Sequence, residues 1–277
     1  MTEEEKIDRA KKYLSQVIDQ MALASSDLKR IIKKNVDDII ENSIDYSYLG
    51  KVFQFSANKK LEEAVKKILN KLEKDLFNII YTRCENAETI AYNKEQKEKS
   101  DDNILAVFLA SEIADKTLDQ RINEYVLNLR GEIEAFVAAG IFKKMTRAEI
   151  LEAYIANLEK PFAAPLLLEI FKESGFSAER IASKGISFGT GKYISSFNNL
   201  KRLEQDTIFK AYSHINQTIW GFDNDYIGWF TRRGSTYQCG ICDSEVGVFH
   251  PKTESFLGYH NRCTCLQIPV YKGDLTR

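Results

Sequence analysis

Proline is scarce in this chain: four prolines occur among 277 residues, and none precedes Pro161. A proline inside a helix removes one backbone hydrogen bond and clashes with the preceding turn. The region before Pro161 can therefore form helices that are long and unbroken.

An excess of either charge is also missing. The net charge is −1 with 29% charged residues, so no overall attraction to nucleic acid or to an anionic membrane is expected. The longest apolar stretches, such as residues 133–142, are interrupted and fall short of the ~20 residues that span a bilayer. The acidic start at residues 1–5 lacks the apolar core of a signal peptide. We expect a cytoplasmic protein without a membrane partner.

Apolar residues recur every three or four positions through most of the chain before residue 215, which predicts amphipathic helices. The clearest stripes cover residues 7–21, 61–80, 118–136 and 150–158, and residues 31–44 continue the first helical region. We expect these stripes to pack on one another as the core of a helical bundle. The amount of helix exceeds what one compact domain needs, which allows an elongated arm.

Several residues predict where these helices begin and end. Ser56 or Asn58 is the expected N-cap of the second stripe, since both side chains can accept a backbone hydrogen bond. Thr146 and Glu149 have the spacing of a capping box. Gly140 is the expected end of the third stripe.

Two segments between the stripes are predicted to be connections. Residues 94–102 are charged and predict a linker, and a short helix is expected from Ser177 to Gly185. The glycine-rich residues 185–193 resemble a phosphate-binding P-loop but fail its pattern, because Ile186 replaces the first glycine and Tyr193 replaces the Ser or Thr after the lysine. This segment is therefore expected to connect helices and not to bind a nucleotide.

The pattern changes after residue 215. Residues 218–222, 226–231 and 266–271 are short, β-branched or aromatic, and predict strands. Pro269 places the last of them at a sheet edge. We therefore expect an α+β protein, with a mostly helical region over residues 1–184 and a small α+β domain with a cysteine-rich loop over residues 185–277.

Four of the five cysteines and two of the three histidines, His250 and His260, lie within residues 239–265. A C-x-x-C turn supplies two ligands to a tetrahedral Zn²⁺, and a second pair must return from a distance. Because the site needs four ligands, the candidates are four of the following five residues: Cys239, Cys242, His260, Cys263 and Cys265. Cys84 stands apart, and we expect it to be a small buried apolar residue.

Other uses of these thiols stay open. Disulfide pairing and free thiols in a small core are alternatives to a structural zinc ion, although disulfides are uncommon in the cytoplasm. A redox dithiol is disfavoured because the C-x-x-C does not open a helix of a βαβ unit. A zinc deaminase needs a Glu two positions after a histidine, and none of His214, His250 and His260 has one.

The C-terminal motifs carry a family resemblance. Cys239-x-x-Cys242-Asp243, Gly247, His260-x-x-Cys263-x-Cys265 and the apolar segment 268–270 with its proline resemble the end of the phage Mu F-like minor head proteins. The likeness extends to further positions and covers residues 185–272 in all. These positions are residues 191–193, 199–203, 206–207, 211–212 and 229–231. That family typically ends in His-Pro-x-Cys-Arg-Cys. Here Asn261 replaces the proline and Thr264 replaces the arginine, while the order and spacing match.

The resemblance implies a structural role and no enzymatic activity. It implies a minor component of a tailed-phage or prophage head, present in few copies near the portal and acting in head morphogenesis and DNA packaging or ejection. The implied partners are the portal or inner head proteins, with weak and non-specific contact to packaged DNA and no small-molecule substrate. The implied location is the bacterial host cytoplasm during assembly, and then the virion.

Two other classes of function compete with this one. A zinc-ribbon nucleic-acid-binding protein could use basic residues interleaved with aromatic ones, namely Arg232, Arg233, Arg262, Lys272 and Arg277 among Trp229, Phe230 and Tyr237. Against it, residues 217–277 hold six basic and six acidic side chains, so a strong positive surface is not expected. An enzyme would need a polar constellation such as Asp225, Arg232 and Glu245 converging near His260.

Overall fold

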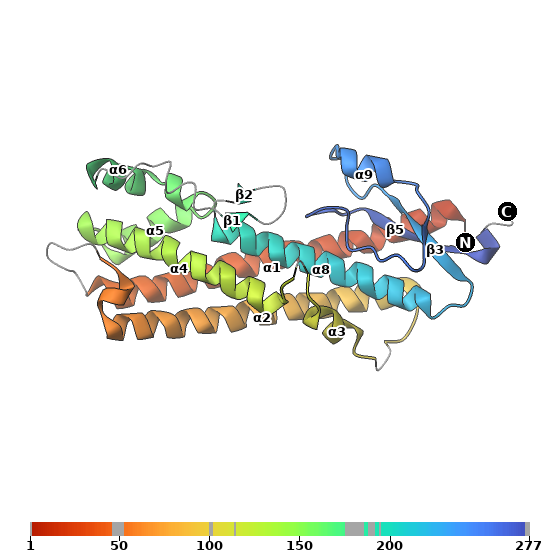
Figure 1. Cartoon of the computed structure of the whole chain (residues 1–277), viewed down its shortest axis with the longest axis horizontal. Helices are drawn as coiled ribbons and strands as arrows, with labels where there is room; N and C mark the ends of the chain where they lie inside the picture. Colours follow the sequence, from red (N-terminus) through yellow and green to blue (C-terminus); the bar gives the residue numbers. More distant parts are fainter. Residues whose placement is uncertain are drawn as a thin grey trace. The chain divides into compact units, whose positions relative to one another are not determined.

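The computed structural model describes residues 2–45, 53–99, 102–113, 115–174, 186–187, 192–193 and 195–274. The chain is mostly helical, with a small three-stranded antiparallel sheet near its C-terminus, so the predicted α+β class is confirmed (Figure 1). Within the described residues, no helix is both long and apolar enough to cross a membrane.

The helices and strands follow one another in this order. The helical part comprises α1 (Glu3–Ile44), η1 (Phe55–Ala57), α2 (Lys59–Glu95), α3 (Ile104–Ala110), α4 (Leu118–Phe142), α5 (Arg147–Ala156), η2 (Pro161–Ala163) and α6 (Pro165–Ser174). Then come β1 (Ile186–Ser187), β2 (Lys192–Tyr193), α8 (Ser196–Gly221), β3 (Tyr226–Arg232), α9 (Gly240–Glu245), β4 (His250–Pro251), β5 (Leu266–Tyr271) and η3 (Lys272–Asp274).

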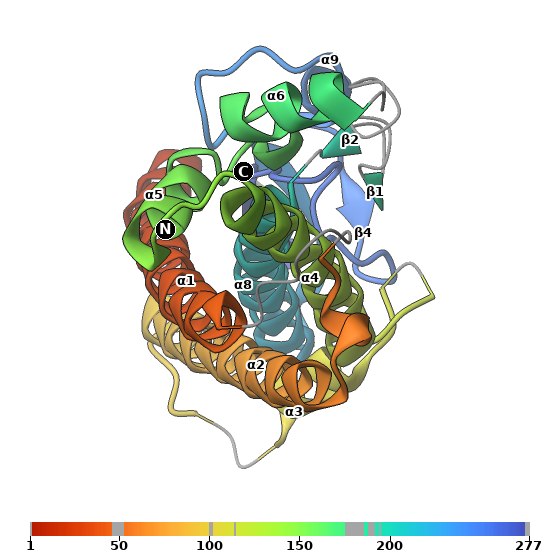
Figure 2. The same ribbon diagram turned by 90° about the vertical axis from the view of Figure 1, so that its left-hand side faces the viewer.

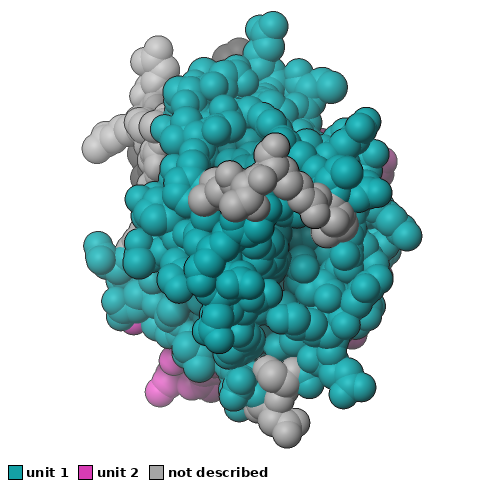
Figure 3. All heavy atoms as spheres, turned by 90° about the vertical axis from the view of Figure 1, so that its right-hand side faces the viewer, with its two compact units in different colours: residues 1–25, 79–117, 202–277 teal, residues 26–78, 118–201 magenta. Residues whose placement is uncertain are grey.

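The chain divides into two compact units, and neither is continuous in sequence (Figure 3). Unit 1 comprises residues 1–25, 79–117 and 202–277, and unit 2 comprises residues 26–78 and 118–201. The helices α1, α2 and α8 each contribute residues to both units. The predicted boundary between residues 184 and 185 lies outside the described residues, so the division into domains 1–184 and 185–277 stays a prediction.

Unit 2 is a helical bundle in which the apolar stripes of the helices pack into a common core. Figure 2 shows α1, α2 and α4 among these helices. Phe136 of α4 and Tyr154 of α5 pack edge to face, with ring centroids 5.1 Å apart. At the surface, Arg147 pairs with Asp37 and Glu41 of α1, each at 2.7 Å. The carboxylate of Glu132 is buried in α4. The large core residues of unit 2 include Leu28, Ile32, Ile39, Ile40, Phe55, Leu61, Leu72 and Tyr125.

Glu132 holds the beginning of α8 within unit 2. Its Oε1 accepts hydrogen bonds from the backbone N–H of Ser196 at 2.7 Å and from the Ser196 hydroxyl at 2.8 Å. The Tyr154 hydroxyl donates to its Oε2 at 3.4 Å. Burial raises the pKa of Glu132 to about 7, although these hydrogen bonds favour its charged form.

Unit 1 joins the two ends of the chain. Its sheet has the order β4-β3-β5, with Trp229 of β3 opposite Pro269 on one side and His250 on the other. The first turns of α1 lie against the last strand (Figure 1): Lys6 Nζ is 2.6 Å from an Asp274 carboxylate oxygen and 3.3 Å from the Pro269 carbonyl. Because β5 is the last strand in the order β4-β3-β5, the edge position predicted for Pro269 is confirmed.

Several predicted boundaries are confirmed. The Asn58 side chain caps α2 by accepting the backbone N–H groups of Lys60 and Leu61 at 3.0 and 3.2 Å. Thr146 and Glu149 form the complete capping box of α5. Strands are present at 226–232 and 266–271.

The strand predicted over residues 218–222 was wrong, because α8 continues to Gly221. Ile215, Asn216, Ile219 and Trp220 recur at helical spacing, and all four are at most 2% exposed. Burial of this face outweighs the β-propensity of the segment, which is a weak local preference.

The linker predicted from residue 94 was also placed too early. α2 continues to Glu95, and Lys94 is buried. Likewise α4 passes through Gly140 to Phe142. This glycine serves close packing: a Cβ there would lie 2.3 Å from Cγ1 of Ile150 on α5.

The remaining connections are described only in part. β1 pairs with β2 through Ile186 opposite Tyr193, within the segment that was predicted to connect helices. The helix predicted from Ser177 to Gly185 lies outside the described residues. α8 begins at Ser196.

Candidate metal centre

Two loops of unit 1 bring the five predicted ligands together. Cys239 is the residue before α9 and Cys242 lies in its first turn. His260 and Cys263 belong to one tight turn, in which the Cys263 N–H donates to the His260 carbonyl at 3.0 Å. Cys265 immediately precedes β5. The five candidate residues therefore lie close together in unit 1, and which four of them would hold an ion stays a prediction.

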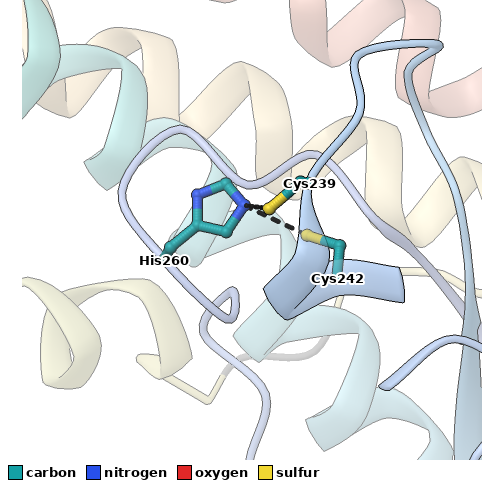
Figure 4. A group of neighbouring side chains, drawn as sticks. All are labelled: Cys239, Cys242 and His260. Carbon is teal, nitrogen blue, oxygen red and sulfur yellow. Dashed lines mark hydrogen bonds between the residues drawn. The ribbon is translucent and has the colours of Figure 1, made fainter. Parts of the chain in front are cut away.

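The donor atoms form two groups that share one sulfur. Cys239, Cys242 and His260 form the first group, and Cys242, Cys263 and Cys265 form the second; within each, the donor atoms lie within 4.8 Å of one another. In Figure 4 the Nε2 atom of His260 points at two sulfurs, 3.2 Å from Cys239 Sγ and 3.0 Å from Cys242 Sγ. The cluster could bind a metal ion.

The spacing of one pair of sulfurs fits tetrahedral coordination. The Sγ atoms of Cys242 and Cys263 are 3.9 Å apart. Two thiolates bound to one Zn²⁺ at about 2.3 Å in a tetrahedron lie roughly 3.8 Å apart. A disulfide would need about 2.05 Å, and all five cysteines are free thiols in this structure.

The pKa values of two of the thiols are lowered, and those of the other two are raised. The backbone N–H of Cys242 hydrogen-bonds to the Cys239 sulfur and lowers the pKa of Cys239. The Cys265 thiol hydrogen-bonds to Cys263 and lowers the pKa of Cys263 to about 5. Burial raises the pKa of Cys242 to about 12, and the hydrogen bond to Cys263 together with burial raises that of Cys265. Metal binding would release the protons that this cluster shares.

The ring of His260 is oriented as a metal ligand would be. Its Nδ1 lies 2.7 Å from the carbonyl oxygen of Asn261, so Nδ1–H donates there, and Nε2 is the nitrogen that faces the sulfurs and could bind a metal. Burial lowers the pKa of His260, but the Asn261 carbonyl and the nearby thiolates outweigh it and raise the pKa.

Residues outside the predicted set hold the ligand loops in place. Asp206 of α8 is buried, and it accepts the backbone N–H of Arg262 at 2.7 Å. Burial raises the pKa of Asp206. Arg262 has φ +62° and Gly258 has φ +89°, so the turn around His260 depends on left-handed backbone. The family resemblance included residues 206–207, but it did not indicate that Asp206 would hold the ligand loop.

Gly234 was missed by sequence reasoning. A Cβ at this position would lie 1.7 Å from the carbonyl oxygen of Thr264. The loop after β3 therefore passes directly against the backbone between Cys263 and Cys265. A lone glycine in a loop gives no sequence signal for such a contact.

We predict that Asp206→Ala weakens zinc binding by about tenfold, because outer-shell partners typically contribute 10–100-fold to metal affinity. Competition with a chromophoric chelator measures this. Asp206→Asn keeps an oxygen that can accept the Arg262 N–H, so its affinity should stay close to that of the unmodified protein. Equal zinc affinity of the alanine variant and the unmodified protein would show that Asp206 does not position the loop.

The polar constellation considered for an enzyme is divided among separate ion pairs. Asp225 pairs with Lys272 at 3.3 Å, and Arg232 pairs with Glu3 at 2.5 Å. Glu245 lies 3.7 Å from His250, which stacks on Trp229 with ring centroids 4.1 Å apart. These side chains have interaction partners other than His260.

No protein-family model, no curated protein and no solved structure matches this chain.

Proposed function

We propose that the cysteine cluster holds a structural Zn²⁺ that ties the loop before β5 to the turn at α9. The observation that carries this is the supply of five protein donors around one shared sulfur, Cys242. A catalytic zinc keeps an open position for water or substrate, whereas a structural one is closed by four protein ligands. Five donors provide a full set of four, so this site fits the structural class.

We further propose that the protein is a minor head protein of a tailed phage or prophage, acting in head morphogenesis and DNA packaging or ejection near the portal. The resemblance of the cysteine motifs supports this, and so does the surface beside them. Three apolar residues close to Cys239 and Cys242 in the sequence, Tyr237, Ile241 and Phe249, are 79%, 55% and 50% exposed. Exposed apolar side chains grouped near one site are typical of protein interfaces. The proposed partner is the portal or an inner head protein.

The alternative is a zinc-ribbon nucleic-acid-binding protein. Its phosphate contacts would come from arginines near the cluster, but two of them already pair with acids. Arg232 pairs with Glu3 and Arg233 lies 3.5 Å from Asp243. These ion pairs reduce the positive charge that is available to DNA phosphates. Contacts between positive side chains and phosphates supply most of the non-specific affinity for DNA. We expect DNA binding no better than micromolar at physiological salt.

Quantitative mass spectrometry of purified virions tests the proposal. We expect the protein at far fewer copies than the capsid protein, and incorporation should fall strongly for the double variant Ile241→Asp, Phe249→Asp. The control is Val107→Asp on α3, a position that is also exposed and should incorporate normally. Absence of the expressed, unmodified protein from virions would contradict the proposal. Tight, salt-dependent DNA binding would favour the alternative.

A further inference from the structure

The last turn of α2 buries a lysine in unit 1. The Lys94 side chain is 5% exposed, and its Nζ donates to Oδ1 of Asn216 at 3.1 Å. Nζ is also 3.1 Å from Oε1 of Glu95 and 4.5 Å from the centre of the Trp220 ring. Lysines are almost never this buried, so the amine is held in one place at a considerable cost in solvation.

Asn216 is fixed just as firmly on α8. It is 2% exposed, and its Nδ2 donates to the backbone carbonyl of Tyr212 at 2.8 Å. That bond turns the amide so that its oxygen faces Lys94. The amide carbon lies one C=O length, about 1.2 Å, beyond this oxygen, which places Nζ between roughly 3.3 and 4.3 Å from it. Reacting atoms in a near-attack arrangement are about 3–3.5 Å apart.

The surroundings favour an uncharged amine. Burial lowers the pKa of Lys94; Glu95 opposes this shift, and the positive charge of Arg9 adds to it. An amine without its proton is a nucleophile, as in other buried reactive lysines. The carboxylate of Glu95 is within hydrogen-bond reach and can accept the proton.

We propose that Lys94 and Asn216 react with each other to form an isopeptide bond, with Glu95 carrying the proton. Nζ of Lys94 attacks Cγ of Asn216, the Nζ–Cγ bond forms and the Cγ–Nδ2 bond breaks. Glu95 takes one proton from Nζ and returns it to Nδ2, so that ammonia leaves. The step needs no oxidant, metal or cofactor, because an amine and an amide exchange for an amide and ammonia.

The structure has room for the leaving group. A cavity of about 10 Å³ is lined by Lys94, Asn216, Tyr212 and Ser213, among others. A volume of this size holds about one water molecule, and ammonia is similar in size. The leaving group therefore does not have to displace side chains at the moment of bond cleavage.

The bond would link α2 and α8 covalently inside unit 1. It would close a loop between residues 94 and 216 in the unfolded chain, and cross-links that close long loops stabilise mainly by restricting that state. Unlike a disulfide, such a cross-link would persist under reducing conditions.

Intact-mass measurement of the purified full-length protein tests this proposal. We expect a mass lower than the sequence mass by one ammonia, and a branched peptide joining the Lys94 and Asn216 segments after digestion. Lys94→Arg and Glu95→Gln should retain the full mass. Lys97→Arg is the matched control, because this exposed lysine lies three residues after Lys94, past the end of α2, and it should lose ammonia like the unmodified protein.

The mass of the Asn216→Asp variant gives a second test, in which both reacting side chains are kept. Water would leave in place of ammonia, so its cross-linked product should have the same mass as that of the unmodified protein. Circular dichroism on each variant confirms that it is folded. A full sequence mass for the folded, unmodified protein after prolonged incubation overturns the proposal. An ammonia loss that persists in Lys94→Arg overturns it as well.

Discussion

Cys242→Ser is expected to destabilise unit 1 more than replacement of any other single cluster residue. Its sulfur belongs to both groups of donors, so its loss leaves neither group complete. Structural zinc contributes about 10–16 kcal/mol of apparent binding free energy in zinc-finger peptides. A part of this, about 3–5 kcal/mol, would lower the melting temperature by roughly 10 °C in a chain of this size. Thermal unfolding followed by circular dichroism measures the shift.

Two controls identify the cause of that shift. Cys84→Ala removes a buried thiol outside the cluster, so it should cost only about 1 kcal/mol for the small cavity. The unmodified protein treated with a strong chelator should melt at the same temperature as Cys242→Ser. If chelation has no effect and a reducing agent lowers the melting temperature instead, the cluster forms disulfides and the zinc proposal is wrong.

Glu132→Gln is expected to stabilise the protein at pH 8 and to leave it little changed at pH 4.5. Burial raises the pKa of Glu132 to about 7 from an ordinary 4.5, so the folded state binds a proton that the unfolded state releases. The free energy of unfolding therefore falls as pH rises from 4.5 to 7, by about 3 kcal/mol in all. The stabilising contribution is complete below pH 4.5 and is lost above pH 7.

Glutamine removes this pH dependence without removing the contacts. Its oxygen can accept from Ser196 and its amide can donate to the Tyr154 hydroxyl, the two partners that Glu132 has now. Denaturant unfolding at a series of pH values between 5 and 8 measures the difference between the variant and the unmodified protein. Glu152→Gln, on the exposed side of α5, is the control and should follow the unmodified protein at every pH. A constant difference between Glu132→Gln and the unmodified protein would contradict the assignment.

Local rules account for what could be predicted from the sequence. Asn58 and the Thr146–Glu149 pair were identifiable because a cap acts on residues two or three positions away. The strand at Leu266–Tyr271 was identifiable by its alternation, and its edge position by the missing N–H of Pro269. The five candidate donors were identifiable because four cysteines and a histidine lie within one short segment of the sequence.

Contacts between distant segments account for what could not be predicted. The β-branched and aromatic residues 218–222 predicted a strand, yet the burial of Ile219 and Trp220 keeps them helical. Lys94 looked like part of a charged linker because nothing nearby in the sequence reveals Asn216, which is 122 positions away. Gly234 and Asp206 support the ligand loops through contacts that only the folded chain creates.

The composition of unit 1 has a consequence for synthesis on the ribosome. Residues 1–25 emerge well before the strand that contains Pro269, with which Lys6 makes contact. The apolar stripe of this early α1 segment therefore lacks its final partners until that strand has been translated. Such non-local pairing folds slowly and leaves apolar surface exposed in the meantime. Recovery of soluble protein should depend on chaperone supply and on a slower translation rate more than on the stability of the finished fold.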